Sequence, residues 1–463
     1  MVAPRIVPRA EHPISRQDID PDALKVLHRL RQGEHTAYLV GGSVRDLILG
    51  RRPKDFDIGT SAHPYQVKKL FRNCWIIGRR FRLAHVKFGQ KVIEVATFRR
   101  QVAAGEEVVQ DGVPAPDPTT AEGEQLIHHD NTFGTPEEDA FRRDFTINAL
   151  AYDISNFSII DYVGGLEDLR AGVVRMIGDP DLRLNEDPVR MLRAIAIAAR
   201  LNFTIEPTLL AAIRRHRQEI AKSSPPRLLE EYYKILRAGS SEKAFRNLAD
   251  VGLLEPIATE LHRGAKDPLW RSLAALDAYR HRFESTPDTL TNGILLGSLL
   301  VPLGISLSPG VRVDSERTQS GRKVDATRTQ RGHSAGSEQG EGPPPPPHRR
   351  PPREPVPRLG ELPLARRDVE RLRQVMSLQR RIRDVSASAR AQQSLAHRSI
   401  FREALTWMEI HGGMPEVVAH WNTVIAETEP PEPAADGVEH PVPSGRRRRR
   451  RRGRRRGFTP PAG

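Results

Sequence analysis

Two aspartates, Asp55 and Asp57, are separated by one residue in the segment DFDIGT at residues 55–60. The alternating apolar residues of this segment predict a β-strand, on which positions i and i+2 point to the same face. Two carboxylates on one face repel each other unless a cation lies between them. Mg²⁺ prefers hard oxygen ligands and usually takes one or two carboxylates together with substrate phosphates. The pair therefore indicates a metal site for a phosphorylated substrate, although a solvated strand edge is the commoner explanation of such a pair alone.

A double glycine, Gly41-Gly42, precedes this pair. It ends an apolar run at 37–42 that predicts a short buried strand. Residues 43–50 then predict a helix, with Ser43 as N-cap and Gly50 as its stop. Backbone N–H groups at such a turn can approach a phosphate closely. A double glycine is usually only a tight turn, but combined with the two aspartates it indicates a site for a metal-bound triphosphate.

The elements that must position these residues follow from apolar periodicity. The first third of the chain mixes both periods and predicts an α/β domain with a small sheet. Helices are predicted at 21–32, 43–50 and 63–71, and strands at 37–42, 55–60, 84–88 and 91–98. Residues 1–20 are predicted to be a flexible arm, and the polar residues 101–130 a mobile surface loop.

From residue 185 onward the pattern is helical, with helices predicted at 207–221, 226–238, 241–250, 269–281, 289–302 and within 363–427. Residues 306–357 interrupt this pattern with few apolar residues and the run Pro343–Pro347. Such a segment cannot bury enough surface to offset its ordering entropy, so we predict a disordered insertion. Residues 428–463 are predicted to be a disordered tail rich in Pro and Arg.

Charge indicates a polyanionic partner. The chain has 463 residues and a formal net charge of +14. Ten arginines lie at 446–452 and 454–456, and +14 minus these ten leaves +4 for the rest. A cationic tail of this kind favours nucleic acid as the partner. The single cysteine, Cys74, excludes an internal disulfide and a Cys-rich metal site. We find no leader-like segment and no run of about 20 apolar residues, so we expect a cytoplasmic protein without a membrane span.

Four motifs in order resemble the class II nucleotidyltransferases, which comprise bacterial poly(A) polymerases and CCA-adding enzymes. The motifs are LVGGSVRDLILGRRPKDFDI (39–58), RRDFTINAL (142–150), DYVGGLEDL (161–169) and EDPVRMLRA (186–194). The resemblance covers residues 35–260 well and the C-terminal helices poorly. It implies an α+β fold, whose parts are a nucleotidyltransferase head with a mixed or antiparallel sheet (21–153), an RNA- and nucleotide-binding helical neck (154–240) and a helical body (241–305 and 358–427).

The resemblance also implies an acidic site. Asp55, Asp57 and Glu94 would bind Mg²⁺, and Asp144 would be a further acidic active-site residue. Glu94 could instead be an exposed strand glutamate. Asp144 could have a structural role, paired with one of the two arginines before it in RRDFTIN.

Two groups of residues would bind the nucleotide if the resemblance holds. Gly41, Gly42 and Arg45 would contact the triphosphate, although Arg45 could instead pair with Asp46 or Asp57.

The motif EDPVR resembles the protein template that selects the incoming base, through Asp187 and Arg190, with Arg193 close by. Pro188 in the first turn also fits a plain helix start with a salt bridge. Ala196 stands where the family leads us to expect a basic residue, which puts the detailed base or phosphate contacts in doubt.

The segment GRRFRLAH (78–85) resembles the poly(A) polymerase version of this region. We therefore predict a polynucleotide adenylyltransferase that adds AMP from ATP to RNA 3′ ends without a template, releases pyrophosphate and uses two metal ions. Such an enzyme would promote mRNA polyadenylation and RNA turnover, and its Arg-rich tail would contact RNA nonspecifically. The alternatives are a CCA-adding tRNA nucleotidyltransferase and, from another class, a nonenzymatic RNA-binding protein that kept the fold.

Overall fold

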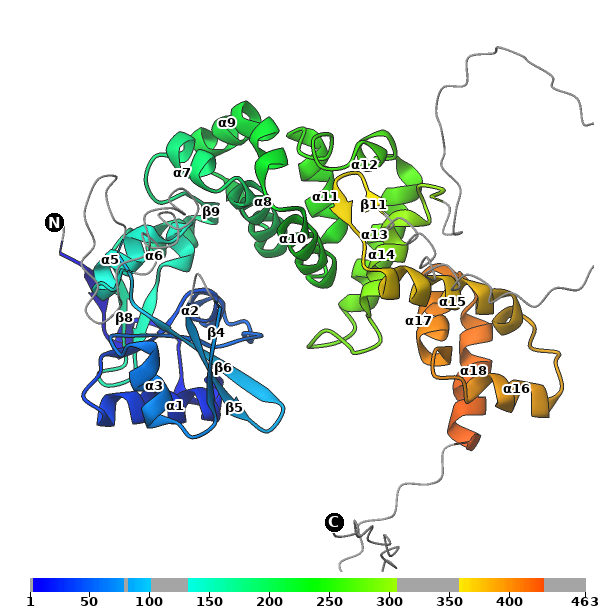
Figure 1. Cartoon of the computed structure of the whole chain (residues 1–463), viewed down its shortest axis with the longest axis horizontal. Helices are drawn as coiled ribbons and strands as arrows, with labels where there is room; N and C mark the ends of the chain where they lie inside the picture. Colours follow the sequence, from blue (N-terminus) through cyan, green and yellow to red (C-terminus); the bar gives the residue numbers. More distant parts are fainter. Residues whose placement is uncertain (1–2, 79–81, 101–131, 306–357, 429–463) are drawn as a thin grey trace, which may run out of the picture.

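The structure, a computed structural model, describes residues 3–78, 82–100, 132–305 and 358–428. In Figure 1 the strands gather in a head at one end of the molecule. Helices α7–α11 arch away from the head, and α15–α18 lie at the far end. The α+β fold predicted from the sequence is thus confirmed, with a sheet-containing head followed by helices.

The head is built on a mixed eight-stranded sheet with the order β1-β8-β7-β2-β3-β6-β5-β4. Neighbouring strands are antiparallel except β3 and β6, which are parallel. The strands are β1 (Arg5–Val7), β2 (Ala37–Val40), β3 (Asp57–Thr60), β4 (Cys74–Ile77), β5 (Leu83–Phe88), β6 (Lys91–Thr97), β7 (Ala151–Asp153) and β8 (Ser158–Asp161).

Helix α1 (Pro21–Gln32) shows why the head folds as the periodicity predicts. Its buried residues recur every three or four positions and pack against the sheet: Ala23, Val26, Leu27 and Leu30. The Asp20 side chain caps it by accepting from the N–H groups of residues 22 and 23. The other short head helices are α2 (Gly42–Ile48), α3 (Pro64–Leu70), α5 (Pro136–Arg142) and α6 (Gly165–Ala171), with 3₁₀ turns at Arg9–Glu11, Arg16–Asp18 and Thr146–Asn148.

The neck and body are mainly helical. The helices are α7 (Pro180–Glu186), α8 (Val189–Leu201), α9 (Pro207–His216), α10 (Pro225–Arg237), α11 (Ser241–Asp250), α12 (Thr259–Arg263), α13 (Asp267–Arg280), α14 (Asn292–Leu300), α15 (Arg366–Arg383), α16 (Ala389–Ala396), α17 (Phe401–His411) and α18 (Pro415–Thr428), with a 3₁₀ helix at Arg217–Lys222. Two small strand pairs accompany them: β9 (Val173–Val174) with β10 (Thr204–Ile205), and β11 (Arg358–Leu359) with β12 (Leu362–Pro363).

Two local expectations are wrong. The expected flexible arm at 1–20 is ordered from residue 5, because β1 pairs with β8 and because Ile14 and Ile19 are buried in the core. The strand expected at 55–60 begins only at Asp57, which leaves Asp55 outside it. The reason is that Asp57 pairs with Val40, the last residue of β2, so the residues before Asp57 have no partner on that strand.

Three predicted segments lie outside the described residues: the mobile loop at 101–130, the disordered insertion at 306–357, and the tail after residue 428. Within the described ranges, no helix is both long and apolar enough to cross a membrane.

Candidate active site

The chain passes from β2 into α2 through Gly41-Gly42, which we call the glycine turn. Gly41 has φ 77° and ψ −140°, a conformation that only glycine adopts without strain. A methyl group on Gly41 would lie 3.1 Å from Arg143 Nη1 and 4.0 Å from Asp57 Oδ2. A cation and a carboxylate thus both lie close to Gly41.

The carboxylates around the turn are not equally placed. Asp57 opens β3, and Glu94 lies on the neighbouring strand β6, where the register sets Ile58 beside Val95 and hence Asp57 beside Glu94. Asp55 precedes β3, its side chain is 74% exposed, and its Oδ2 lies 3.8 Å from Lys54 Nζ. The structure therefore brings Asp57 and Glu94 together and leaves Asp55 at the solvent side of them.

The Asp57 carboxyl has its pKa raised to about 6. The largest cause is desolvation by the protein atoms packed around it, and the next is the negative charge of Glu94. Arg143 lowers the pKa and Asp55 raises it further. An excess of negative charge at Asp57 is what a bound cation would relieve.

In the described part of the chain, no three His, Cys, Asp or Glu side chains are grouped so that they could hold a metal ion. The donors present still suit Mg²⁺, because this ion commonly takes one or two carboxylates and completes its shell with water and substrate phosphates.

The Arg45 side chain is buried and paired within the head. It is 5% exposed, and its Nε donates to Asp46 Oδ1 at 2.8 Å. Its Nη1 donates to Asn148 Oδ1, and a methyl group on Gly42 would lie 3.3 Å from its Nη2. Of the two possibilities left open by the sequence, the geometry favours pairing with Asp46, directly beneath the glycine turn.

The neck helix α8 is tied to the head through two arginines. Arg200 Nη2 donates to both Asp46 carboxylate oxygens, at 3.0 and 2.9 Å. Arg193 Nη2 lies 2.8 Å from Asp144 Oδ2. Asp144 therefore pairs with Arg193 of the neck and not with either arginine before it. Its Oδ1 accepts from the N–H of Phe145 at 2.9 Å.

These contacts form a closed set, which we call the anchor ring. Asn148 Nδ2 donates to Asp144 Oδ1 at 3.4 Å, so the ring runs from α8 through Asp144, Asn148, Arg45 and Asp46 back to α8. Arg45, Asp46 and Asp144 are buried, so their charges are held in fixed positions.

The two residues expected to select the base lie at the junction of α7 and α8. Asp187 accepts two hydrogen bonds from Arg227 of α10, at 2.9 and 2.6 Å. Arg190 Nη1 donates to the Arg183 carbonyl at 2.6 Å and to Glu186 Oε2 at 3.1 Å. A carboxylate has about four acceptor positions, so the contact with Arg227 leaves Asp187 able to accept further hydrogen bonds.

Sequence reasoning missed two residues of this site. Arg143 was considered only as a partner of Asp144, yet it approaches the glycine turn and affects Asp57. Its Nε and Nη2 are held by Asp139, at 3.1 and 3.0 Å. Arg227 is 40 residues from Asp187 in sequence, and no local pattern links them. The sequence signal that could have identified Arg143 as a site residue is its position within the motif RRDFTIN.

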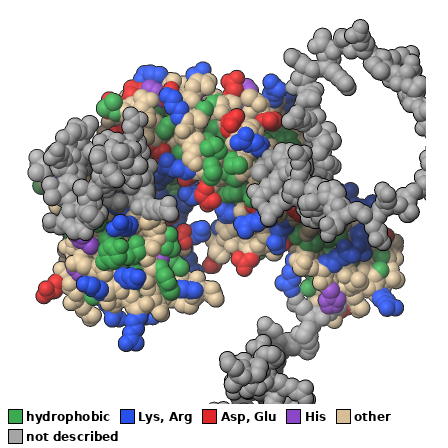
Figure 2. Space-filling view, viewed as in Figure 1, with side chains coloured by type: hydrophobic (Ala, Val, Ile, Leu, Met, Phe, Trp, Pro, Cys, Tyr) green, Lys and Arg blue, Asp and Glu red, His purple; other side chains and the backbone are tan. Residues whose placement is uncertain are grey.

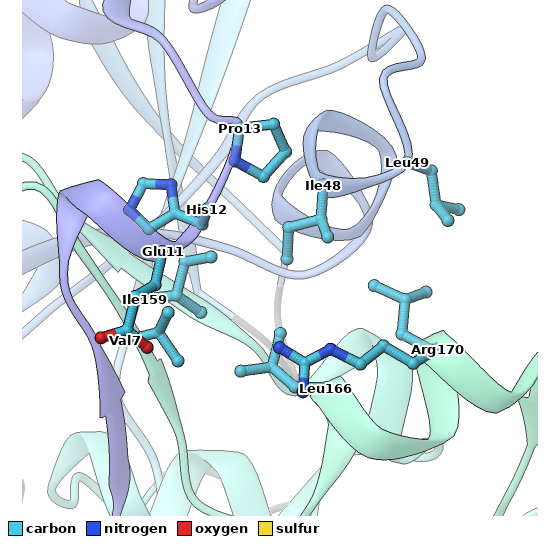
Figure 3. Close-up of a pocket in the computed structure, with 10 residues that line it drawn as sticks. Val7, Glu11, His12, Pro13, Ile48, Leu49, Ile159, Leu166 and Arg170 are labelled. Atoms are coloured by element: carbon cyan, nitrogen blue, oxygen red, sulfur yellow. The ribbon is translucent and has the colours of Figure 1, made fainter.

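A cavity of about 250 Å³ lies elsewhere in the head (Figure 3). It is enclosed by the N-terminal segment around His12, the end of α2 at Ile48 and Leu49, and α6 at Leu166. Its walls are mainly apolar, and neither the glycine turn nor the carboxylates line it. We therefore place no substrate there.

Comparison with known proteins gives three family matches along the chain. Residues 37–175 match the "Poly A polymerase head domain", and residues 202–264 match the "Probable RNA and SrmB- binding site of polymerase A". Residues 358–456 match the "Polymerase A arginine-rich C-terminus". The three matches follow the order of head, neck and C-terminal part.

Curated relatives agree with these matches. Poly(A) polymerase I of Salmonella typhi is 50% identical over 260 residues, which are 56% of this chain and 54% of that protein. The Haemophilus influenzae protein of the same name is 42% identical over 253 residues, 54% of each chain. A CCA-adding enzyme of Lactobacillus johnsonii is 37% identical over 247 residues, 53% of this chain and 57% of that one. The matched part thus spans about half the length of these relatives.

Among solved structures, the CCA-adding enzyme of Bacillus stearothermophilus in complex with CTP has a TM-score of 0.58. The likeness covers 88% of this chain and 83% of that one at 24% identity, and it shows a shared fold. The head, RNA-binding and arginine-rich C-terminal matches, with the poly(A) polymerase I relatives, show that the chain belongs to the bacterial poly(A) polymerase family.

Proposed function

We propose that this protein is a polynucleotide adenylyltransferase that extends RNA 3′ ends with AMP from ATP. The observation that carries the proposal is the glycine turn with Asp57 and Glu94 beside it, inside a region that matches the poly(A) polymerase head. The Gly41 N–H already donates to the Leu150 carbonyl, so the turn contributes a close approach of the backbone to phosphates, and Asp57 and Glu94 contribute carboxylates for a divalent cation at the same place. A nonenzymatic RNA-binding protein would not need a carboxyl group whose surroundings disfavour its ionised form.

The reaction forms one bond and breaks one. The RNA 3′ hydroxyl oxygen attacks the α-phosphorus of ATP, and its proton passes to solvent. The bond between the α-phosphorus and the bridging oxygen breaks, and pyrophosphate leaves. Asp57, with Glu94 and Asp55 near it, would hold Mg²⁺, which when bound supplies Lewis-acid stabilisation of both oxygens.

The residues around the turn position the triphosphate in this proposal. The glycine turn allows the backbone to approach the phosphates, and Arg143 adds a positive charge beside them. Gly42 and Arg45 support the turn and do not contact the phosphates themselves. The Arg45 guanidinium packs against Gly42 and is fixed by Asp46. The anchor ring fixes this assembly to the neck, where Asp144 and Arg193 meet.

Base selection is proposed for Asp187 and Arg190. The pairing edge of adenine presents an amino donor and a ring-nitrogen acceptor, which a carboxylate and a guanidinium complement. Arg227 holds the Asp187 carboxylate on both oxygens and thereby fixes its orientation. We propose that the ten arginines of the tail, which lies outside the described residues, add sequence-independent contacts to RNA phosphates.

The alternative is a CCA-adding enzyme with the same chemistry. The Salmonella and Haemophilus poly(A) polymerases are 50% and 42% identical, against 37% for the Lactobacillus CCA-adding enzyme, and this favours poly(A) synthesis. The test is to incubate the full chain with an unstructured RNA, Mg²⁺ and ATP alone. We expect long adenylate tails. Addition that requires CTP and a tRNA and stops after three nucleotides would overturn the assignment.

A further inference from the structure

One row of side chains crosses the sheet from the carboxylates to an exposed tryptophan on the edge strand β4. Asp57 of β3 lies beside Glu94 of β6, Glu94 lies opposite His85 of β5, and His85 lies opposite Trp75. Residues paired across neighbouring strands point to the same face, so these four side chains share one surface. The contact between His85 Nε2 and Glu94 Oε1, at 3.7 Å, is consistent with this order.

This surface exposes large apolar side chains without a structural need. Trp75 is 53% exposed, Ile77 51% and Val92 42%. The alternate residues of the same strands, Cys74 and Ile93, are buried, so the core side of the sheet is already filled. In Figure 2 hydrophobic side chains are visible on the head where Figure 1 draws β6. Exposed apolar groups gathered on one surface commonly mark an interaction site.

The same surface carries an exposed positive charge. Lys87 of β5 lies opposite Val92 and is exposed on the same face. An exposed aromatic ring with a lysine on the same face, beside a site for RNA 3′ ends, complements a single strand of nucleic acid, whose bases stack and whose phosphates are negative.

The spacing also suits an RNA primer. Three neighbouring-strand distances of about 4.8 Å separate Asp57 from Trp75, or roughly 14 Å. Stacked nucleotides rise about 3.4 Å each, so this distance corresponds to about four nucleotides.

We propose that the primer face, defined as Trp75, Ile77, Val92 and Lys87, is a stacking site for bases about four nucleotides from the 3′ end of the RNA primer. The inference rests on the proposed function, which places the reacting 3′ end at Asp57 and so sets the direction in which the RNA strand runs. Stacking on an aromatic ring is tolerant of sequence, which suits a polymerase that must accept any RNA and then its own product.

Tryptophan fluorescence tests binding separately from catalysis. The chain has four tryptophans, and Trp270, Trp407 and Trp421 are buried, so Trp75 is the one that solvent reaches most. Adding a single-stranded RNA of about ten nucleotides without ATP should quench the exposed component of the emission. In the full chain carrying Trp75→Ala, that RNA-dependent change should disappear.

Kinetics with primers of two lengths complete the test. Trp75→Ala should raise KM for the ten-nucleotide primer about ten-fold, with a much smaller change in kcat. A dinucleotide primer, which is too short to reach Trp75, should show no such rise. Trp75→Phe should restore most of the affinity. The matched control is Ile6→Ala on the opposite edge strand, where Ile6 is 59% exposed, and it should behave as the parent.

Three results would overturn the proposal. The first is an unchanged emission on adding RNA, which would leave the adenylyltransferase assignment intact. The second is an equal effect of Trp75→Ala on both primer lengths. The third is an emission that depends on protein concentration without RNA, together with a loss of dimer mass in Trp75→Ala, which would make this face a contact between copies of the chain.

Discussion

The anchor ring and the primer face occupy neighbouring parts of one head, yet their side chains are held in opposite ways. Arg45, Asp46 and Asp144 are buried and fixed by ion pairs that reach α8. Trp75 and Ile77 are about half exposed. A reacting phosphate must be positioned within a fraction of an ångström, which rigid buried charges allow. The RNA must advance after every addition, so the surface that binds it must release any base sequence.

The largest loss of stability is expected from breaking the anchor ring with Asp46→Ala. The change leaves Arg45 buried without its carboxylate, which should cost about 3 kcal/mol of unfolding free energy. Because the glycine turn rests on Arg45, kcat should also fall by about 100-fold. Urea unfolding and ATP incorporation measure the two effects.

Asp181→Ala is the matched control, because Asp181 also pairs with an arginine, Arg215, but at the surface with 43% of its side chain exposed. It should cost much less unfolding free energy than Asp46→Ala, because solvent screens an exposed ion pair, and it should leave kcat unchanged. Equal losses in the two variants would mean that the ring is an ordinary set of salt bridges.

A smaller loss of stability is expected from Gly41→Ala. The positive φ of Gly41 and the nearness of Arg143 should cost about 1–3 kcal/mol and displace the turn, with kcat falling steeply. Gly50→Ala provides the comparison, since Gly50 also has positive φ, 65°, but an added methyl group would have no atom within 4 Å. It should cost about 1–2 kcal/mol through backbone strain alone. Comparable kcat values for the two variants at matched temperature below both melting points would contradict a role for the turn.

The smallest change in stability is expected from Asp57→Asn, and it is an increase. The folded-state pKa of about 6 lies above the ordinary value of 3.8, so an ionised Asp57 destabilises the fold. That cost is complete above pH 6 and vanishes as pH falls towards 4. Asp57→Asn should therefore raise stability at pH 7.5 by up to about 1 kcal/mol after solvent screening, and not at pH 4.

Thermal melts with and without Mg²⁺ measure this effect without any assay of activity. Mg²⁺ should stabilise the parent and have little effect on Asp57→Asn, because the ion binds only the folded parent. A variant less stable than the parent at pH 7.5 would show that Asp57 supports the fold and does not carry excess charge.

Much of the head was predictable because its signals are local. The apolar run before Gly41-Gly42, the helix after it and the strand containing Glu94 follow from periodicity and turn residues. Motif likeness selected Asp57, Glu94 and Asp144 as active-site acids and Arg193 as a nucleotide contact. In the structure Asp57 lies beside Glu94, and Asp144 pairs with Arg193.

Local signals fail where pairing partners are distant in sequence. The alternation in DFDIGT predicted that Asp55 and Asp57 share a strand face, but β2 ends opposite Asp57, and no pattern within the segment reveals that limit. β1 pairs with β8, about 150 residues away, so the arm looked flexible. The pairing of Asp187 with Arg227 and of Asp46 with Arg200 depends in the same way on how α8 and α10 pack.

The central claim is that the carboxylates beside the glycine turn carry adenylate transfer. The most direct test is incorporation of labelled AMP from ATP into an unstructured RNA by the full chain carrying Asp55→Asn and Asp57→Asn, with RNA binding and melting temperature measured on the same sample. We predict a loss of incorporation on the order of 1000-fold or more, with RNA still bound and the fold intact. Incorporation at the rate of the parent would contradict the account.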